Sequence, residues 1–183
     1  TADGKLDNSG QGHMAAGGDM ALAAEVLDNA AGTIEHAGTG TLAITATTLE
    51  GTDGTIASNG ALTLTGETTN LRDATTTAKR VTLDTGSLTT PGGTLTAAGD
   101  DPMALRVRGT LDNSAGAIRS NGGLHLQAGA LTNAAGAISS AGAAAADITV
   151  SGRLDNTGGT IATAGATTVG AGDIINQGGR EQA

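Results

Sequence analysis

The chain has 183 residues and a net charge of −9, and Ala, Gly and Thr fill 96 of its positions, whereas Phe, Tyr, Trp and Cys are absent. A compact enzyme of this size would normally bury aromatic side chains, and disulfides or thiolate metal sites require Cys, so the composition disfavours these classes. The acidic charge and the missing aromatic rings also argue against nucleic-acid binding, and no apolar run reaches the ~18 residues of a membrane span.

An eight-residue phrase recurs from one end of the chain to the other. It begins with Leu, carries Gly at its sixth place and ends on a second aliphatic residue. The six copies are Leu27–Ile34, Leu49–Ile56, Leu88–Leu95, Leu111–Ile118, Leu131–Ile138 and Leu154–Ile161. Degenerate copies begin at Leu6 and Ile174, and Leu71 opens a damaged one. The first residues of these copies lie about 21 positions apart, and a fixed period of this length indicates a repeat protein.

Each unit continues with another Gly and a short run in which apolar and polar residues alternate. The alternating runs are Leu42–Ile44, Leu62–Leu64, Leu124–Leu126, Ile148–Val150 and Thr167–Val169. Such alternation, rich in Thr and β-branched residues, predicts half-buried strands, and the frequent Gly residues argue against helices. One unit therefore reads as three short strands joined by turns.

Winding these units into a solenoid places equivalent residues of successive units above one another, where they pair as parallel strands. The predicted fold is all-β, a right-handed parallel β-helix of about 21 residues per coil, because parallel crossovers are overwhelmingly right-handed. We expect residues 1–183 to form a single β-helical segment of about eight coils. Thr1 follows neither an initiator Met nor a signal stretch, so we expect a fragment of a longer chain.

Two features depart from the repeat. The unit at 71–87 is short, and its Arg72–Arg80 stretch lacks the middle strand pattern, which predicts an irregular coil with a kink or an exposed loop. Extra residues gather at one corner of other units, at Thr39–Thr41, Asp100–Pro102 and Ala143–Asp147, and we expect them to protrude along one face.

Polar residues also recur at fixed places. Asn stands two positions after the first residue of the unit, and because stacked amides bond from coil to coil, this position predicts an asparagine ladder. Its members are Asn8, Asn29, Asn113, Asn133, Asn156 and Asn176. Asp7, Asp28 and Glu50 share the preceding place and predict a column of like charges facing solvent, with a weak calcium site as the alternative.

No catalytic motif is visible. His13, His36 and His125 fall at different places in the coil and are expected to face solvent. Four arginines, Arg106, Arg108, Arg119 and Arg153, are interpreted as scattered. We find no nucleophile elbow, phosphate-binding loop or metal motif, so we expect no enzyme and no catalytic, cofactor-binding or metal-binding residue, and hence no cofactor.

Three phrases carry a resemblance to a known family. Leu27–Ile34 (LDNAAGTI), Leu111–Leu124 (LDNSAGAI followed by RSNGGL) and Leu154–Val169 (LDNTGGTI followed by ATAGATTV) resemble the haemagglutinin repeats of filamentous haemagglutinin-type exoproteins. These are two-partner-secretion adhesins, related to the exoproteins of contact-dependent growth inhibition, and the likeness covers essentially the whole chain.

The resemblance implies a shaft segment of a secreted, surface-held filamentous adhesin of a Gram-negative bacterium, which presents binding regions for attachment to host cells. It implies an outer-membrane transporter as partner during export and a host receptor or glycan as partner on the host cell. Two alternatives stay open. The segment itself binds a receptor or carbohydrate through its loops or through the break at 72–80, or it is the stick of a growth-inhibition protein that delivers a toxin.

Overall fold

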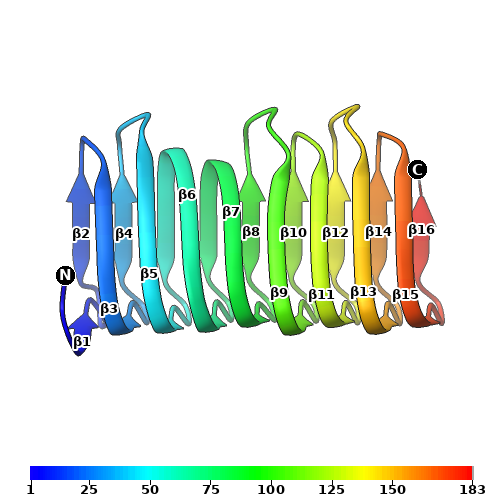
Figure 1. The fold of residues 1–183 in the computed structure, drawn as a ribbon, viewed down its shortest axis with the longest axis horizontal. Coiled ribbons are helices and arrows are strands. Elements are labelled where there is room, and N and C mark those ends of the chain that lie inside the picture. Colours follow the sequence, from blue (N-terminus) through cyan, green and yellow to red (C-terminus); the bar gives the residue numbers. More distant parts are fainter. Residues whose placement is uncertain (183) are drawn as a thin grey trace.

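The computed structural model describes residues 1–182, which form strands, turns and loops without a helix. All the strand pairs in this part of the chain are parallel. The strands are β1 (Lys5–Asp7), β2 (His13–Ala16), β3 (Met20–Asp28), β4 (Thr33–His36), β5 (Thr41–Glu50), β6 (Thr55–Asn70), β7 (Thr75–Thr89), β8 (Thr94–Ala97), β9 (Met103–Asp112), β10 (Ala117–Ser120), β11 (Leu124–Thr132), β12 (Ala137–Ser140), β13 (Ala146–Asp155), β14 (Thr160–Thr163), β15 (Thr167–Ile175) and β16 (Arg180–Gln182). Figure 1 shows them side by side along one axis, with the two chain ends at opposite ends of the stack.

Equivalent residues of successive coils lie above one another in a single column. Leu6 pairs with Leu27, Leu27 pairs with Leu49, and at the other end Leu154 pairs with Ile174. The fold is thus a parallel β-solenoid of about eight turns, with strands stacked about 21 residues apart. The predicted β-helix and its period are confirmed.

In most coils, a loop separates the second predicted strand from the third, but the third and the following first strand are continuous. The middle strands, such as β4, β8 and β10, are short and end at loops, whereas the third strand runs on into the first strand of the next phrase. In β11 and β13 the register shifts between Ala128 and Leu131, which marks the corner between the two. Inward side chains, mostly Leu, Ile, Val and Ala, form a buried core along the axis from Leu27 to Ile161, and partly buried residues of the coils at either end pack against it.

The LDNxxG phrase forms a tight turn. The Gly32 N–H donates to the carbonyl of Asn29 (3.0 Å), and Ala31 has a φ of 52°, in the left-handed region. A Cβ at Gly32 would collide with the backbone carbonyl of Asn8 in the coil below. Gly at the sixth place is therefore required because two coils approach each other closely there.

Leu71 does not begin a coil, which corrects its assignment as a first residue. Thr69 pairs with Leu49 on one side and with Leu88 on the other, so Thr69 occupies the leucine column. Leu71 lies two places further, where the other coils carry Asn, and its N–H donates to the carbonyl of Thr89 (2.7 Å). Leu71 resembles a first residue in the sequence because a threonine, Thr69, stands where the pattern requires Leu.

The exposed loop expected at Arg72–Arg80 is also wrong, although the pairing of β7 with β6 does shift register between Ala78 and Arg80. Within this stretch, β7 pairs in register with β6 through Thr75–Ala78 and with β8 through the same residues. Its inward positions are Thr76 and Ala78, both buried, so the strand lacks the aliphatic alternation that identifies the others. The coil is short because β7 continues past Ala78 as far as Thr89, whereas most other coils have a loop at this corner.

The remaining loops project from one edge of the stack, as expected. They comprise residues 37–40, 98–102 and 141–145, together with the shorter 17–19, 121–123 and 164–166. Figure 1 shows all of them at the same edge, with the tight turns at the opposite edge. Ala146 and Asp147, which the sequence placed in a loop, belong to β13. No helix in the described part of the chain is long and apolar enough to cross a membrane.

Candidate functional site

The predicted asparagine ladder is present inside the turn edge. Where the following coil also carries Asn, Nδ2 of one Asn donates to Oδ1 of the next, from Asn8 to Asn29 (2.7 Å) and from Asn113 to Asn133 (2.7 Å). It continues from Asn133 to Asn156 (2.7 Å) and then to Asn176, with Asn156 fully buried. The bonds that Asn8, Asn113 and Asn133 donate lie at buried positions, and the last bond, to Asn176, is partly buried, so the ladder is a structural element that joins the coils.

The ladder is interrupted in the centre of the molecule. Gly51, Leu71 and Thr90 occupy the Asn place in three successive coils, as their backbone hydrogen bonds show. The Thr90 hydroxyl donates to Oδ1 of Asn113 (3.1 Å) and so begins the second part of the ladder. The two ladder segments are therefore separated by coils that Gly51 and Leu71 leave without a side-chain amide at this place.

The predicted acidic column is confirmed at its first members. Asp7 pairs with Asp28, and Asp28 pairs with Glu50. The ammonium group of Lys5 lies 2.9 Å from a carboxylate oxygen of both Asp7 and Asp28. Lys5 therefore offsets part of their repulsion. Hydrogen bonds from Lys5 and then from Ser9 hold the pKa of the Asp7 carboxyl well below its usual range, and both carboxylates raise the pKa of Lys5.

The acidic side chains also cap the turn that follows them. Oδ1 of Asp155 accepts hydrogen bonds from the hydroxyl (2.6 Å) and the N–H (3.1 Å) of Thr157, and Arg153 lies 2.6 Å from Oδ2. These contacts, the Thr157 hydroxyl foremost, lower the pKa of Asp155. Among residues 1–182, no three His, Asp or Glu side chains are grouped so that they could hold a metal ion, so the geometry gives the calcium alternative no support.

The three histidines differ in environment. His13 and His125 are exposed, and they lie near Glu35 (3.4 Å) and Asp147 (3.2 Å) respectively. His36, which we expected to face solvent, is 1% exposed, and its Nδ1 lies 2.8 Å from the hydroxyl of Ser58. This expectation was wrong because His36 is the last residue of β4 and points inward, into a column where other coils have Ser, Thr or Ala.

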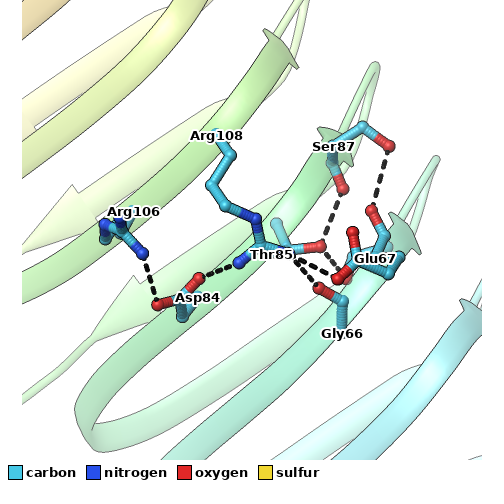
Figure 2. A network of polar contacts seen from close by, with 8 residues as sticks. Gly66, Glu67, Asp84, Thr85, Ser87, Arg106 and Arg108 are labelled. Atoms are coloured by element: carbon cyan, nitrogen blue, oxygen red, sulfur yellow. Dashed lines mark hydrogen bonds and ion pairs between the residues drawn. The ribbon is translucent and has the colours of Figure 1, made fainter.

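Two of the arginines interpreted as scattered converge on one acidic residue (Figure 2). Arg106 in β9 donates to Oδ2 of Asp84 in β7 (3.0 Å), and Arg108 donates to Oδ1 of the same carboxylate. Arg108 also reaches β6, where it donates to Oε1 of Glu67 (2.8 Å) and to the carbonyl of Gly66 (3.0 Å). One side chain therefore connects three coils on the outer face.

This network was missed at the sequence level although a signal exists. Arg106 stands 22 residues after Asp84 and in the same register position, so the two side chains are neighbours on the outer face. The sequence pattern hides this register because it points to Leu71, and not to Thr69, as the first residue of the coil. The carboxylates already pair with the guanidinium groups, and we see no group here that is arranged as a nucleophile with a base.

The loop edge contains a polar hollow of about 250 Å³. It is formed where the loop around Gly40 and the loop around Asp101 lie close to Lys79 and Arg80 of β7, and Arg80 lies 3.8 Å from Asp101. Two of the predicted protruding segments and the end of the Arg72–Arg80 stretch thus share one surface. Ala143–Asp147 is not part of this hollow.

The stacked coils and the internal ladder define a class, the elongated repeat proteins built as parallel β-solenoids. The model of the haemagglutinin repeat matches residues 1–48, 37–101, 104–158 and 144–183. The chain therefore belongs to the haemagglutinin-repeat family. No curated protein and no solved structure matched it. Proteins of this family are generally secreted surface adhesins, and the family and fold are those of structural adhesins, not of enzymes.

Proposed function

We propose that this chain is a shaft segment of a secreted filamentous adhesin, held at the surface of a Gram-negative bacterium, which keeps binding regions at a distance for attachment to host cells. The observation that carries the proposal is the continuous column from Leu6 to Ile174. About eight steps of ~4.8 Å give a rod roughly 40 Å long. A continuous core, with buried amide bonds between the coils of the two ladder segments, supports a role in reach and stiffness.

Export through an outer-membrane transporter of the two-partner type belongs to the same proposal. The chain has no Cys, so no disulfide would form before it passes the outer membrane. A host receptor or glycan would then bind elsewhere on the longer exoprotein.

An in-register deletion in the displayed exoprotein tests the shaft role. Leu111 and Leu154 lie two coils apart in one column, so removing residues 111–153 joins Thr110 to Leu154 without changing the register. We expect normal surface display, a rod shorter by roughly 10 Å in electron micrographs, and preserved attachment to host cells. Removing residues 111–142 instead breaks the register and should lower display. Loss of attachment by the normally displayed 111–153 deletion would contradict a pure shaft.

The loop edge supports a second candidate, in which the segment itself contacts a receptor or carbohydrate. The polar hollow at Gly40, Lys79, Arg80 and Asp101 is the observation in its favour. Binding of the purified chain to host cells or to a glycan array distinguishes the two functions. Saturable binding that Arg80→Ala abolishes, and that Arg153→Ala leaves unchanged, would favour direct binding over the shaft.

A further inference from the structure

The coil from Thr69 to Ser87, here called the threonine coil, has an unusual interior. Thr69, Thr76 and Thr85 all point into the core and are at most 1% exposed. In the next coil the residues paired with them are Leu88, Leu95 and Val107. The threonine coil therefore buries three hydroxyl groups where its neighbour buries aliphatic groups only, which reduces the apolar area that holds it in the stack.

The buried hydroxyls are incompletely paired. Those of Thr69 and Thr85 bond to each other (3.1 Å), and Thr85 also donates to the carbonyl of Ser87 (3.1 Å). The hydroxyl of Thr76 has no hydrogen-bond partner among residues 1–182. A buried polar group without a partner disfavours the folded coil. The same coil carries Leu71 at the Asn place, and the coil before it carries Gly51 there. No ladder bond therefore joins these two coils.

On its outer face, side-chain hydrogen bonds and ion pairs connect this coil to both neighbours. Asp84 belongs to the threonine coil, Glu67 to the coil before it and Arg108 to the coil after it, and the guanidinium group of Arg108 contacts both acids (Figure 2). We call these three residues the arginine strap. Arg108 passes over the whole threonine coil, from the coil on one side to the carbonyl of Gly66 on the other.

We propose that the arginine strap is a salt-sensitive latch over the threonine coil, and that the shaft opens at this coil first when the latch is released. The interior of the threonine coil supplies less cohesion than that of the following coil, so the outer bonds contribute a larger share of what keeps the threonine coil closed. Their side chains are 38% to 68% exposed. Salt screens charges that are this exposed, so the local opening should depend on ionic strength.

Hydrogen–deuterium exchange of the purified chain tests the proposal, with the protection of peptides from 69–87 compared with that of peptides from 131–153. In wild type, raising NaCl from about 0.01 M to about 1 M should accelerate exchange in the threonine coil about threefold to tenfold and leave 131–153 nearly unchanged. Arg108→Gln should produce local acceleration at the same place at low salt and reduce the salt dependence, of which the remaining pair between Arg106 and Asp84 keeps a part.

The matched control is Arg153→Gln. Arg153 pairs with Asp155 inside a single coil (2.6 Å), so its loss removes a surface ion pair without releasing a bond between coils. Glu67→Gln, which removes one charge of the strap, should give a smaller effect at the same place. Equal protection of 69–87 in wild type and Arg108→Gln, or acceleration spread evenly over all coils, would overturn the proposal.

Discussion

Asn133→Ala tests whether the ladder contributes to stability as its geometry indicates. Asn133 is fully buried, accepts from Nδ2 of Asn113 and donates to Oδ1 of Asn156, both at 2.7 Å. It also donates to the carbonyl of Thr160 (3.2 Å). Removing the amide leaves the buried Oδ1 of Asn156 without its donor, which costs about 1–3 kcal/mol of folding free energy. Each hydrogen bond that is lost with the amide costs about 1 kcal/mol more. We expect the free energy of unfolding to fall by about 3 kcal/mol.

Urea unfolding followed by far-UV circular dichroism measures this loss, and hydrogen exchange around 117–140 localises it. Asn176→Ala is the matched control, because Asn176 is exposed and only accepts the last ladder bond. The control should lose less than about 1 kcal/mol. If both variants unfolded at the wild-type urea concentration, the ladder would not stabilise the stack and the reasoning would be refuted.

Three further predictions follow from single positions. Gly136→Ala should lower the free energy of unfolding by about 2–3 kcal/mol, because the new Cβ would collide with the backbone carbonyl of Asn113. Gly4 has open space around it, so Gly4→Ala should leave the stability unchanged. Equal urea midpoints for the two variants would contradict this prediction. Thr76→Val should stabilise the chain by about 1 kcal/mol because it removes a hydroxyl that lacks a partner among residues 1–182, and a lower melting temperature would count against it. The pKa of Asp155 is lowered in the folded chain, so its ionised carboxylate stabilises the fold above the ordinary carboxyl pKa of about 4. This stabilisation is lost as the pH falls through the lower pKa of the folded state. Asp155→Asn should therefore lose less stability on acidification than wild type, and parallel pH curves would disprove the assignment.

The repeat made most of the fold predictable. A regular interval between aliphatic residues has one simple physical solution, which is to place them in one column, and Leu27 and Leu154 do belong to one stack. The ladder was predictable for the same reason, since Asn at a fixed place in successive coils must meet Asn of the next coil. The turn with Gly at its sixth place followed from the repeated phrase alone.

The errors have a common cause, which is that register can be read only where side chains reveal it. Thr69 and Thr76 occupy aliphatic columns, so the sequence pattern points to Leu71 as the first residue and shows no strand at Thr75–Ala78. His36 points inward although its residue type is usually found at the surface. The contact between Arg106 and Asp84 followed from the same register and was lost with it.

The ladder bonds all run the same way along the rod. The amide of Asn8 donates toward the later coil, and so do those of Asn113, Asn133 and Asn156. A finished coil that carries Asn at this place therefore presents an amide donor toward the carboxyl end, where the oxygen of the next asparagine will arrive. A chain that leaves a pore with its amino end first can use each completed layer as the template for the following one, so assembly acquires a direction from the amides themselves.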